Sequence, residues 1–222
     1  KARDQGAWVG YVHAYAGEED PLEGYLGGAK GMMVDAALGT TDAVEWSNAS
    51  RAGFYPMYAL WNNGLKVSVC GGEDSISDVH RSKLVGSLRT YVCTGDKSLE
   101  MKAWFDGLKK GHAFVSNGPL IDFTVEEKIP GETVRLPSSG GVVKIAVEVK
   151  SIVPLEKVLL VFNGQVLEEF YLAGDRTHFE SRKAYTVKES GWYHLRTEGK
   201  PEERYPLDAL YAQAFTNPVW IQ

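Results

Sequence analysis

The stretch Val158–Phe170, VLLVFNGQVLEEF, contains two apolar segments joined by Asn163-Gly164. Asn-Gly is the strongest short signal for a β-hairpin, because both residues tolerate the positive φ angles of a tight two-residue turn. Upstream of it, the stretch 140–151 (GGVVKIAVEVKS) alternates apolar and polar residues, which is typical of a strand with one buried face. Short strands separated by turns, with no helix between them, predict a small β-sandwich.

The same pattern continues to the end of the chain. The segment 183–199 predicts two strands around the turn Glu189-Ser190-Gly191, and the segment 212–222 (AQAFTNPVWIQ) predicts one last strand. We therefore expect residues 121–222 to form an all-β sandwich domain, with a linker near the stretch 117–132.

Residues 1–120 differ from this, because strand-like and helix-like segments alternate there. The expected strands are 6–13, 42–46, 65–70, 87–93 and 112–119, and the expected helices are 51–64 and 97–111, the second with Ser98 as its N-cap. Strands that alternate with helices predict an α/β domain with a largely parallel sheet.

Composition excludes several classes of protein. The net charge of −5 disfavours nucleic-acid binding, which relies on Lys and Arg to neutralise phosphates. No apolar run approaches the 18 residues of a membrane span. Cys70 and Cys93 are too few for a disulfide framework, and both lie in apolar strand-like runs, so we expect buried free thiols.

Polar residues that follow the expected strands are candidates for a functional site, because the carboxyl ends of parallel strands gather such residues at one edge. Imidazole and carboxylate groups together bind zinc, manganese or iron, which makes a bound water nucleophilic. The candidates are His13, Glu45, Glu73, Asp74, His80 and Asn117.

Each candidate also has a purely structural interpretation. His13 could be a hydrogen-bonded residue at the end of a strand, and Glu45 could face solvent or pair with an arginine. The stretch 71–75 (GGEDS) could be a polar turn, and His80 and Arg81 could be a solvated pair in a loop. The residues by themselves leave both interpretations open.

Five segments, in order, resemble the C-terminal part of the CehA/McbA family of metallohydrolases, in the PHP (polymerase and histidinol phosphatase) superfamily. They are GAWVGYVHAYAG, MMVDAALGTTDAVEWSN, CGGEDSISDVHRSKLVGSLRTYV, AWFDGLKKGHAFVSNGPLIDFTV and AFTNPVWI. The resemblance covers most of the chain, from about residue 5 to residue 222. Each segment is weak by itself, and the specificity comes from their order and spacing.

The resemblance implies a fold and an activity. The fold would be the C-terminal part of a distorted, TIM-like (β/α)7 barrel in residues 1–120, followed by the β-sandwich. The barrel would carry up to three divalent metals and hydrolyse phosphate or carbamate esters. His13 and Asp74 match metal-ligand positions, whereas Ile76 stands where many superfamily members have a histidine, and His80 is a candidate to replace it.

The sequence departs further from the superfamily because it contains no His-x-His pair. We therefore expect the chain to begin partway through the barrel and to be inactive by itself, since catalytic zinc sites usually need three protein ligands. The implied ligands are His13, Asp74 and His80, with His80 alternatively a proton donor. Arg81 or Arg89 would steady an oxyanion or phosphate.

Two other hypotheses stay open at this point. The chain could be a non-catalytic binding or structural module, for example one that binds carbohydrate through exposed aromatic side chains on the sandwich. A partial barrel also exposes strand edges, which predicts either a homo-oligomer or a missing N-terminal segment. The β-sandwich that follows the first domain favours an extracytoplasmic location.

Overall fold

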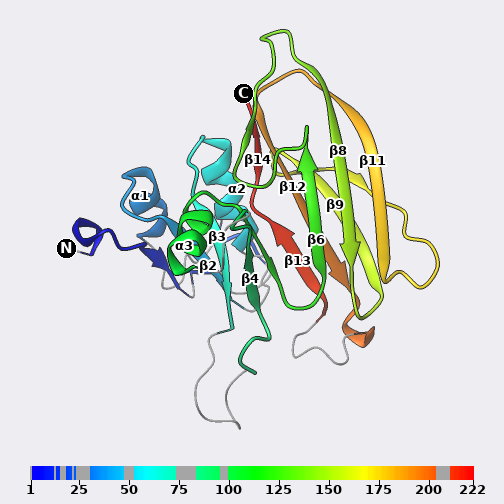
Figure 1. Cartoon of the computed structure of the whole chain (residues 1–222), viewed down its shortest axis with the longest axis horizontal. Helices are drawn as coiled ribbons and strands as arrows, with labels where there is room; N and C mark the ends of the chain where they lie inside the picture. The colour runs from blue at the N-terminus through cyan, green and yellow to red at the C-terminus, as the bar shows by residue number, and fades with distance from the viewer. Residues whose placement is uncertain are drawn as a thin grey trace. The chain divides into compact units, whose positions relative to one another are not determined.

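A computed structural model describes residues 2–12, 14–15, 19–21, 23, 31–47, 53–73, 84–95, 100–203 and 211–222 (Figure 1). The chain divides into two compact units, Lys1–Val115 and Ser116–Gln222. Each unit is considered by itself below.

The first unit contains a three-stranded parallel sheet in the order β1-β2-β3. Its strands are β1 (Gly10–Tyr11), β2 (Ala43–Ser47) and β3 (Ser68–Gly72). Helix α1 (Met32–Ala37) lies between β1 and β2 in the chain, and α2 (Phe54–Asn62) lies between β2 and β3. All three strands run the same way, so their carboxyl ends share one edge of the sheet.

Helix α2 forms where apolar residues recur at helical spacing. Phe54, Met57 and Trp61 are buried on it, and Pro56 is accepted because it lies in the first turn, where its missing N–H would have no partner in the helix. The indole N–H of Trp61 donates to the carbonyl of Val67 at 2.9 Å, which ties the end of the helix to the start of β3.

The rest of the first unit consists of β4 (Arg89–Val92), α3 (Met101–Lys109) and β5 (Ala113–Ser116). Strands β4 and β5 pair with each other and do not join the parallel sheet. Helix α3 begins later than the expected helix, and Glu100 is at its N-cap position. Ser98, the expected cap, lies outside the described residues.

The expectation of a (β/α)7 barrel of the PHP or TIM-like kind is wrong. Strands account for 42% of the described residues and helices for 17%, with three α-helices among them, which fits a β-rich sandwich fold. A barrel needs a closed ring of parallel strands, each followed by a covering helix. In the part of the chain that is described, the parallel sheet stops at three strands.

The second unit is a β-sandwich of two mainly antiparallel sheets, which Figure 1 shows as two layers. One sheet has the order β11-β8-β6, and in the other β10, β9, β12 and β13 follow one another, with β14 pairing with both β12 and β7. The strands are β6 (Leu120–Val125), β7 (Thr133–Val134), β8 (Gly141–Lys150), β9 (Leu155–Phe162), β10 (Gln165–Glu169), β11 (His178–Val187), β12 (Gly191–Gly199), β13 (Gln213–Thr216) and β14 (Val219–Ile221).

Alternation along the strands fills the sandwich core. On β8 the apolar residues Val143, Ile145, Val147 and Val149 are buried, and the polar residues between them face outward. On the opposite sheet, β9 is buried along most of its length, because Val158, Leu159, Leu160 and Val161 all exclude solvent.

One turn of the sandwich was predicted from the sequence, and another was not. Asn163-Gly164 joins β9 to β10 with φ angles of 51° and 86°, which confirms the expected hairpin. The last segment, however, is two strands, β13 and β14, because Asn217-Pro218 interrupts the expected single strand. Pro218 has no N–H to donate to a ladder.

A further tight turn joins Val125 to Lys128 through Glu126 and Glu127, whose φ angles are 49° and 61°. Non-glycine residues with positive φ are strained. We therefore expect Glu127→Gly to raise the free energy of unfolding by about 1 kcal/mol. Urea denaturation of the variant checks this, and Glu189→Gly, in an exposed loop without positive φ, is the control that should not stabilise. An unchanged midpoint in Glu127→Gly would contradict the prediction.

The structure also bears on the membrane and cysteine expectations. None of the described helices is long and apolar enough to cross a membrane. Both cysteines are free. Cys70 is largely buried, but Cys93 is exposed, so the expectation of two buried thiols is wrong for Cys93.

Candidate functional site

The carboxyl edge of the β1-β2-β3 sheet is where the sequence placed its candidate site. Strands β1, β2 and β3 end there at Tyr11, Ser47 and Gly72. Four of the residues proposed as metal ligands or oxyanion contacts lie outside the described residues: His13, Asp74, His80 and Arg81. The structure does show the side chains and backbone contacts of β2 and β3 near this edge.

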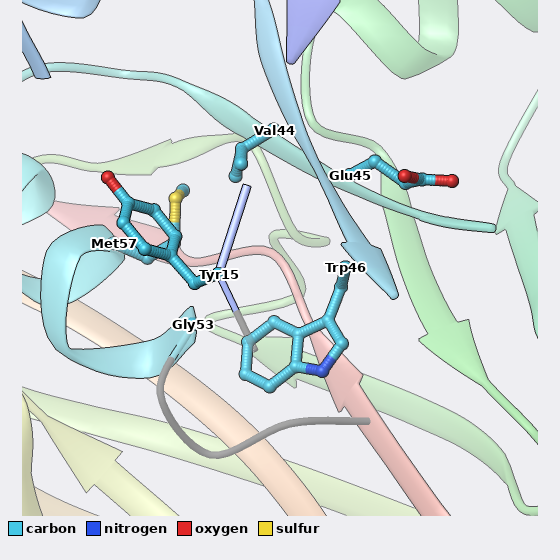
Figure 2. Close-up of a pocket in the computed structure, with 6 residues that line it drawn as sticks. All are labelled: Tyr15, Val44, Glu45, Trp46, Gly53 and Met57. Atoms are coloured by element: carbon cyan, nitrogen blue, oxygen red, sulfur yellow. The ribbon is translucent and has the colours of Figure 1, made fainter. Parts of the chain in front are cut away.

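Glu45 is the best-defined polar residue near this edge. It alternates with Val44 and Trp46 on β2, so its side chain projects from the opposite face of the sheet (Figure 2). Its carboxylate lies over the backbone of Gly72 on β3: a Cβ atom built on Gly72 would be 1.9 Å from the Glu45 Oε1 atom. The position of the carboxylate therefore requires that residue 72 have no side chain.

Cys70 lies on the same face as Glu45, because the two residues are paired in the parallel register of β2 and β3. Burial is the main reason that the pKa of the Cys70 thiol rises to about 12, and the nearby negative charge of Glu45 adds to the effect. The thiol donates to the carbonyl of Val44, with Sγ 3.7 Å from the oxygen. Cys70 therefore stays protonated near neutral pH and is not a nucleophile.

Glu73 follows β3 and has a structural contact. Its Oε1 atom accepts a hydrogen bond of 3.0 Å from the backbone N–H of Gly86, which ties the end of β3 to the turn before β4. Beside it, the hydroxyl of Thr90 accepts from the N–H of Gly71 at 2.7 Å and donates to the carbonyl of the same residue. These contacts fix the backbone on which Gly72 and Glu73 lie.

The other two candidates have contacts of a structural kind. Arg89 is exposed on β4, and its guanidinium lies 3.5 Å from the hydroxyl of Tyr91. Asn117 is buried in the second unit, where its amide donates to the carbonyl of Tyr211 at 2.8 Å and accepts from the N–H of Gln213 at 2.7 Å. Asn117 thus holds β13 to the segment before β6.

The opposite face of β2 carries a small apolar pocket. It is lined by Tyr15, Val44, Glu45, Trp46, Gly53 and Met57, and Figure 2 shows the Glu45 carboxylate turned away from it. Tyr15 is buried, and its hydroxyl has no hydrogen-bond partner in the described part of the chain. Burial raises the pKa of Tyr15 to about 12, so its hydroxyl stays protonated at neutral pH.

The sequence analysis singled out Glu45, Cys70 and the stretch 71–75, but it did not bring them together. Cys70 was expected only to be a buried thiol, and Gly72 only to be part of a polar turn, although the pair Gly71-Gly72 at the end of a buried strand signals a close approach of another group. Within the described residues, no three His, Cys, Asp or Glu side chains are grouped closely enough to hold a metal ion. Comparison with protein-family models, curated proteins and solved structures finds no match to this chain.

Proposed function

We propose that this chain forms part of a metal-dependent hydrolase of phosphate or carbamate esters, with its site at the carboxyl edge of the β1-β2-β3 sheet. The observation that carries the proposal is the position of the Glu45 carboxylate over Gly72. In open sheets of parallel strands, ligands bind just outside the carboxyl ends of the strands, and Glu45 lies two residues before the end of β2.

The metal-dependent part of the proposal rests on His13, Asp74 and His80, together with the resemblance described above. The described residues do not make a metal site by themselves, so we assign them no step that passes through a metal. Among them, Gly72 leaves the space in which the Glu45 carboxylate lies. Glu45 would act as a general base and accept a proton from the attacking water, a role that a carboxylate can take when it is within hydrogen-bond reach of that proton.

The direct test uses the product of the whole gene. Its metal content is measured by elemental analysis, and its turnover of p-nitrophenyl phosphate and of an aryl carbamate is measured before and after chelation. We expect bound divalent metal and turnover that chelation removes and zinc, manganese or iron restores. A protein with neither metal nor turnover would overturn the proposal.

Variants at Glu45 and Gly72 test the role of the carboxylate. We expect Glu45→Gln to lower kcat by about 100-fold or more, because an amide does not accept the proton. Gly72→Ala should also lower kcat while KM changes little, because the new methyl group takes the space of the Glu45 Oε1 atom. The displaced atom ends a flexible side chain, so the cost in stability should be small.

Matched controls separate this effect from general damage. Glu156→Gln changes an exposed glutamate on β9, and Gly141→Ala adds a methyl group that meets Leu136 at 3.4 Å, an ordinary contact. Both should keep full activity. If Gly72→Ala retains the kcat of the unmodified enzyme, the Glu45 carboxylate is not where the reaction needs it, and the role that we assign to it is wrong.

The alternative of a carbohydrate-binding sandwich has less support. Binding modules of that kind need exposed aromatic rings, and the outer face of the β11-β8-β6 sheet has no Phe, Tyr or Trp along its described strands. The outward-facing residues there are Leu120, Asp122, Thr124, Val142, Lys144, Ala146, Glu148, Lys150, His178, Glu180, Arg182, Ala184 and Thr186.

A further inference from the structure

Strand β11 is an unusually long edge strand. It pairs with β8 over all ten of its residues without a bulge, and it is the end strand of the β11-β8-β6 sheet. Edge strands of this length are normally interrupted or covered, because their free backbone groups pair readily with another strand. In the described part of the chain, no backbone hydrogen bond reaches the outer side of β11.

The pairing with β8 identifies which backbone groups are free. The N–H of Ser151 donates to the carbonyl of Thr177 at 2.8 Å, and these two residues are opposite each other when the β11–β8 register is extended by one step. Residues of an antiparallel strand alternate between bonding to one neighbour and bonding to the other. The odd-numbered residues of β11 therefore bond to β8, and the even-numbered residues present N–H and C=O groups at the free edge.

We propose that this edge pairs with the β11 edge of a second copy of the chain, in an antiparallel arrangement centred on Ser181. The two strands can bond only where the free N–H and C=O groups of one copy face those of the other, so even-numbered residues must lie opposite even-numbered residues. Three two-fold registers near the middle of the strand meet this condition: those centred on Glu180, Ser181 and Arg182. Centring on Glu180 sets two glutamates against each other, and centring on Arg182 sets two arginines against each other. Centring on Ser181 places Glu180 of each copy opposite Arg182 of the other.

The charges therefore select one register, because opposite charges facing each other across strands stabilise pairing and like charges oppose it. Both side chains are available for this contact: Glu180 and Arg182 are exposed on the outer face, and only a long contact of 3.8 Å joins them within the chain. The two three-stranded sheets become one six-stranded sheet.

The neighbouring strand β10 adds apolar surface at the same edge of the sandwich. Glu168 on β10 accepts hydrogen bonds from Lys183 and Tyr185 on β11, so the two strands lie next to each other. Beside this contact, Val166 and Leu167 are about half exposed, and Tyr171 is 87% exposed. A second copy seated on β11 would cover part of this surface. One strand pair is small for an interface, so we expect a dissociation constant on the order of 10 µM or weaker.

Sedimentation equilibrium of the whole chain over a range of concentrations tests the proposal. We expect a monomer–dimer equilibrium that weakens as salt is added. Glu180→Arg should weaken the association about tenfold, since it replaces two favourable pairs by two unfavourable ones. Arg182→Glu should do the same, and the double variant Glu180→Arg/Arg182→Glu should restore the original association.

Two controls make the result decisive. Glu189→Arg makes the same change of charge in the turn between β11 and β12, beyond the residues that pair in the proposed dimer, and should leave the association unaltered. Arg182→Pro removes an N–H only at the free edge, so it should abolish dimerisation while the β-rich circular dichroism spectrum is retained. A monomer at every concentration, or a dimer that Glu180→Arg does not weaken, would overturn the proposal. Failure of the double variant to restore association would overturn the proposed register.

Discussion

Replacement of Gly140 by alanine is expected to lower the free energy of unfolding of the second unit by about 3 kcal/mol or more. Gly140 has a φ angle of 80°, and a Cβ atom there would be 2.1 Å from the carbonyl oxygen of Val187. Both obstacles belong to the backbone, so no side-chain rotation relieves them. The chain would have to shift where β8 begins and β11 ends, which disturbs the last pair of that ladder, Val187 with Gly141.

The matched control is Gly174→Ala. Gly174 also has a positive φ, 64°, but no atom lies within 4 Å of the position that its Cβ would take. The control should therefore cost only the conformational strain, about 1 kcal/mol. Guanidinium denaturation of both variants, followed by tryptophan fluorescence, gives the difference. If both variants lose the same free energy of unfolding, the close approach to the Val187 carbonyl does not add to the cost of Gly140→Ala.

Local patterns in the sequence were sufficient for much of the sandwich. Alternation on β8 and the Asn163-Gly164 turn each depend on neighbouring residues, and both were correctly predicted. The turn at Glu126-Glu127 was not, because two glutamates are not a turn signal. There the pairing of the flanking strands forces positive φ angles on residues that do not favour them, and that information lies outside the turn.

The barrel failed as a prediction because alternation of strands and helices does not specify how many strands join one sheet. The segments that became β4 and β5 look like those that became β2 and β3, yet they pair with each other instead. Sheet membership depends on contacts between residues far apart in the sequence. The expected first strand, 6–13, also shrank to Gly10–Tyr11, since an apolar run does not by itself fix how long the pairing extends.

The candidate site shows the same limit at the level of single residues. Glu45 could be chosen from its place at the end of an expected strand, but the need for glycine at position 72 could not. These residues are 27 positions apart, and their contact follows from the register of β2 and β3 (72 − 45 = 27). Only the structure shows that residue 72 must lack a side chain if the carboxylate is to lie there.

Acidification should destabilise the second unit through His194. This side chain is fully buried, and burial is the main reason that its pKa falls from 6.5 to about 3, with the nearby charge of Arg196 adding to it and the hydrogen bond from Nδ1 to the carbonyl of Thr216 opposing it. Below pH 6.5 the unfolded chain binds a proton at this histidine and the folded chain does not. Stability is therefore complete above pH 6.5 and falls until pH 3, by about 5 kcal/mol in total and by about 2 kcal/mol at pH 5.

Other groups also titrate in this range, so the effect of His194 is measured as a difference between variants. His194→Asn keeps an N–H donor for the carbonyl of Thr216 but does not titrate. We expect it to be less stable than the unmodified chain at pH 7, and to lose about 2 kcal/mol less between pH 6.5 and pH 5. His178→Asn removes an exposed imidazole and should keep most of the original pH dependence. Urea denaturation at several pH values provides the comparison. The prediction is wrong if the stability of His194→Asn falls with pH as steeply as that of the unmodified chain. The acid sensitivity would then arise elsewhere, and the imidazole of His194 would not be excluded from water as its complete burial on β12 implies.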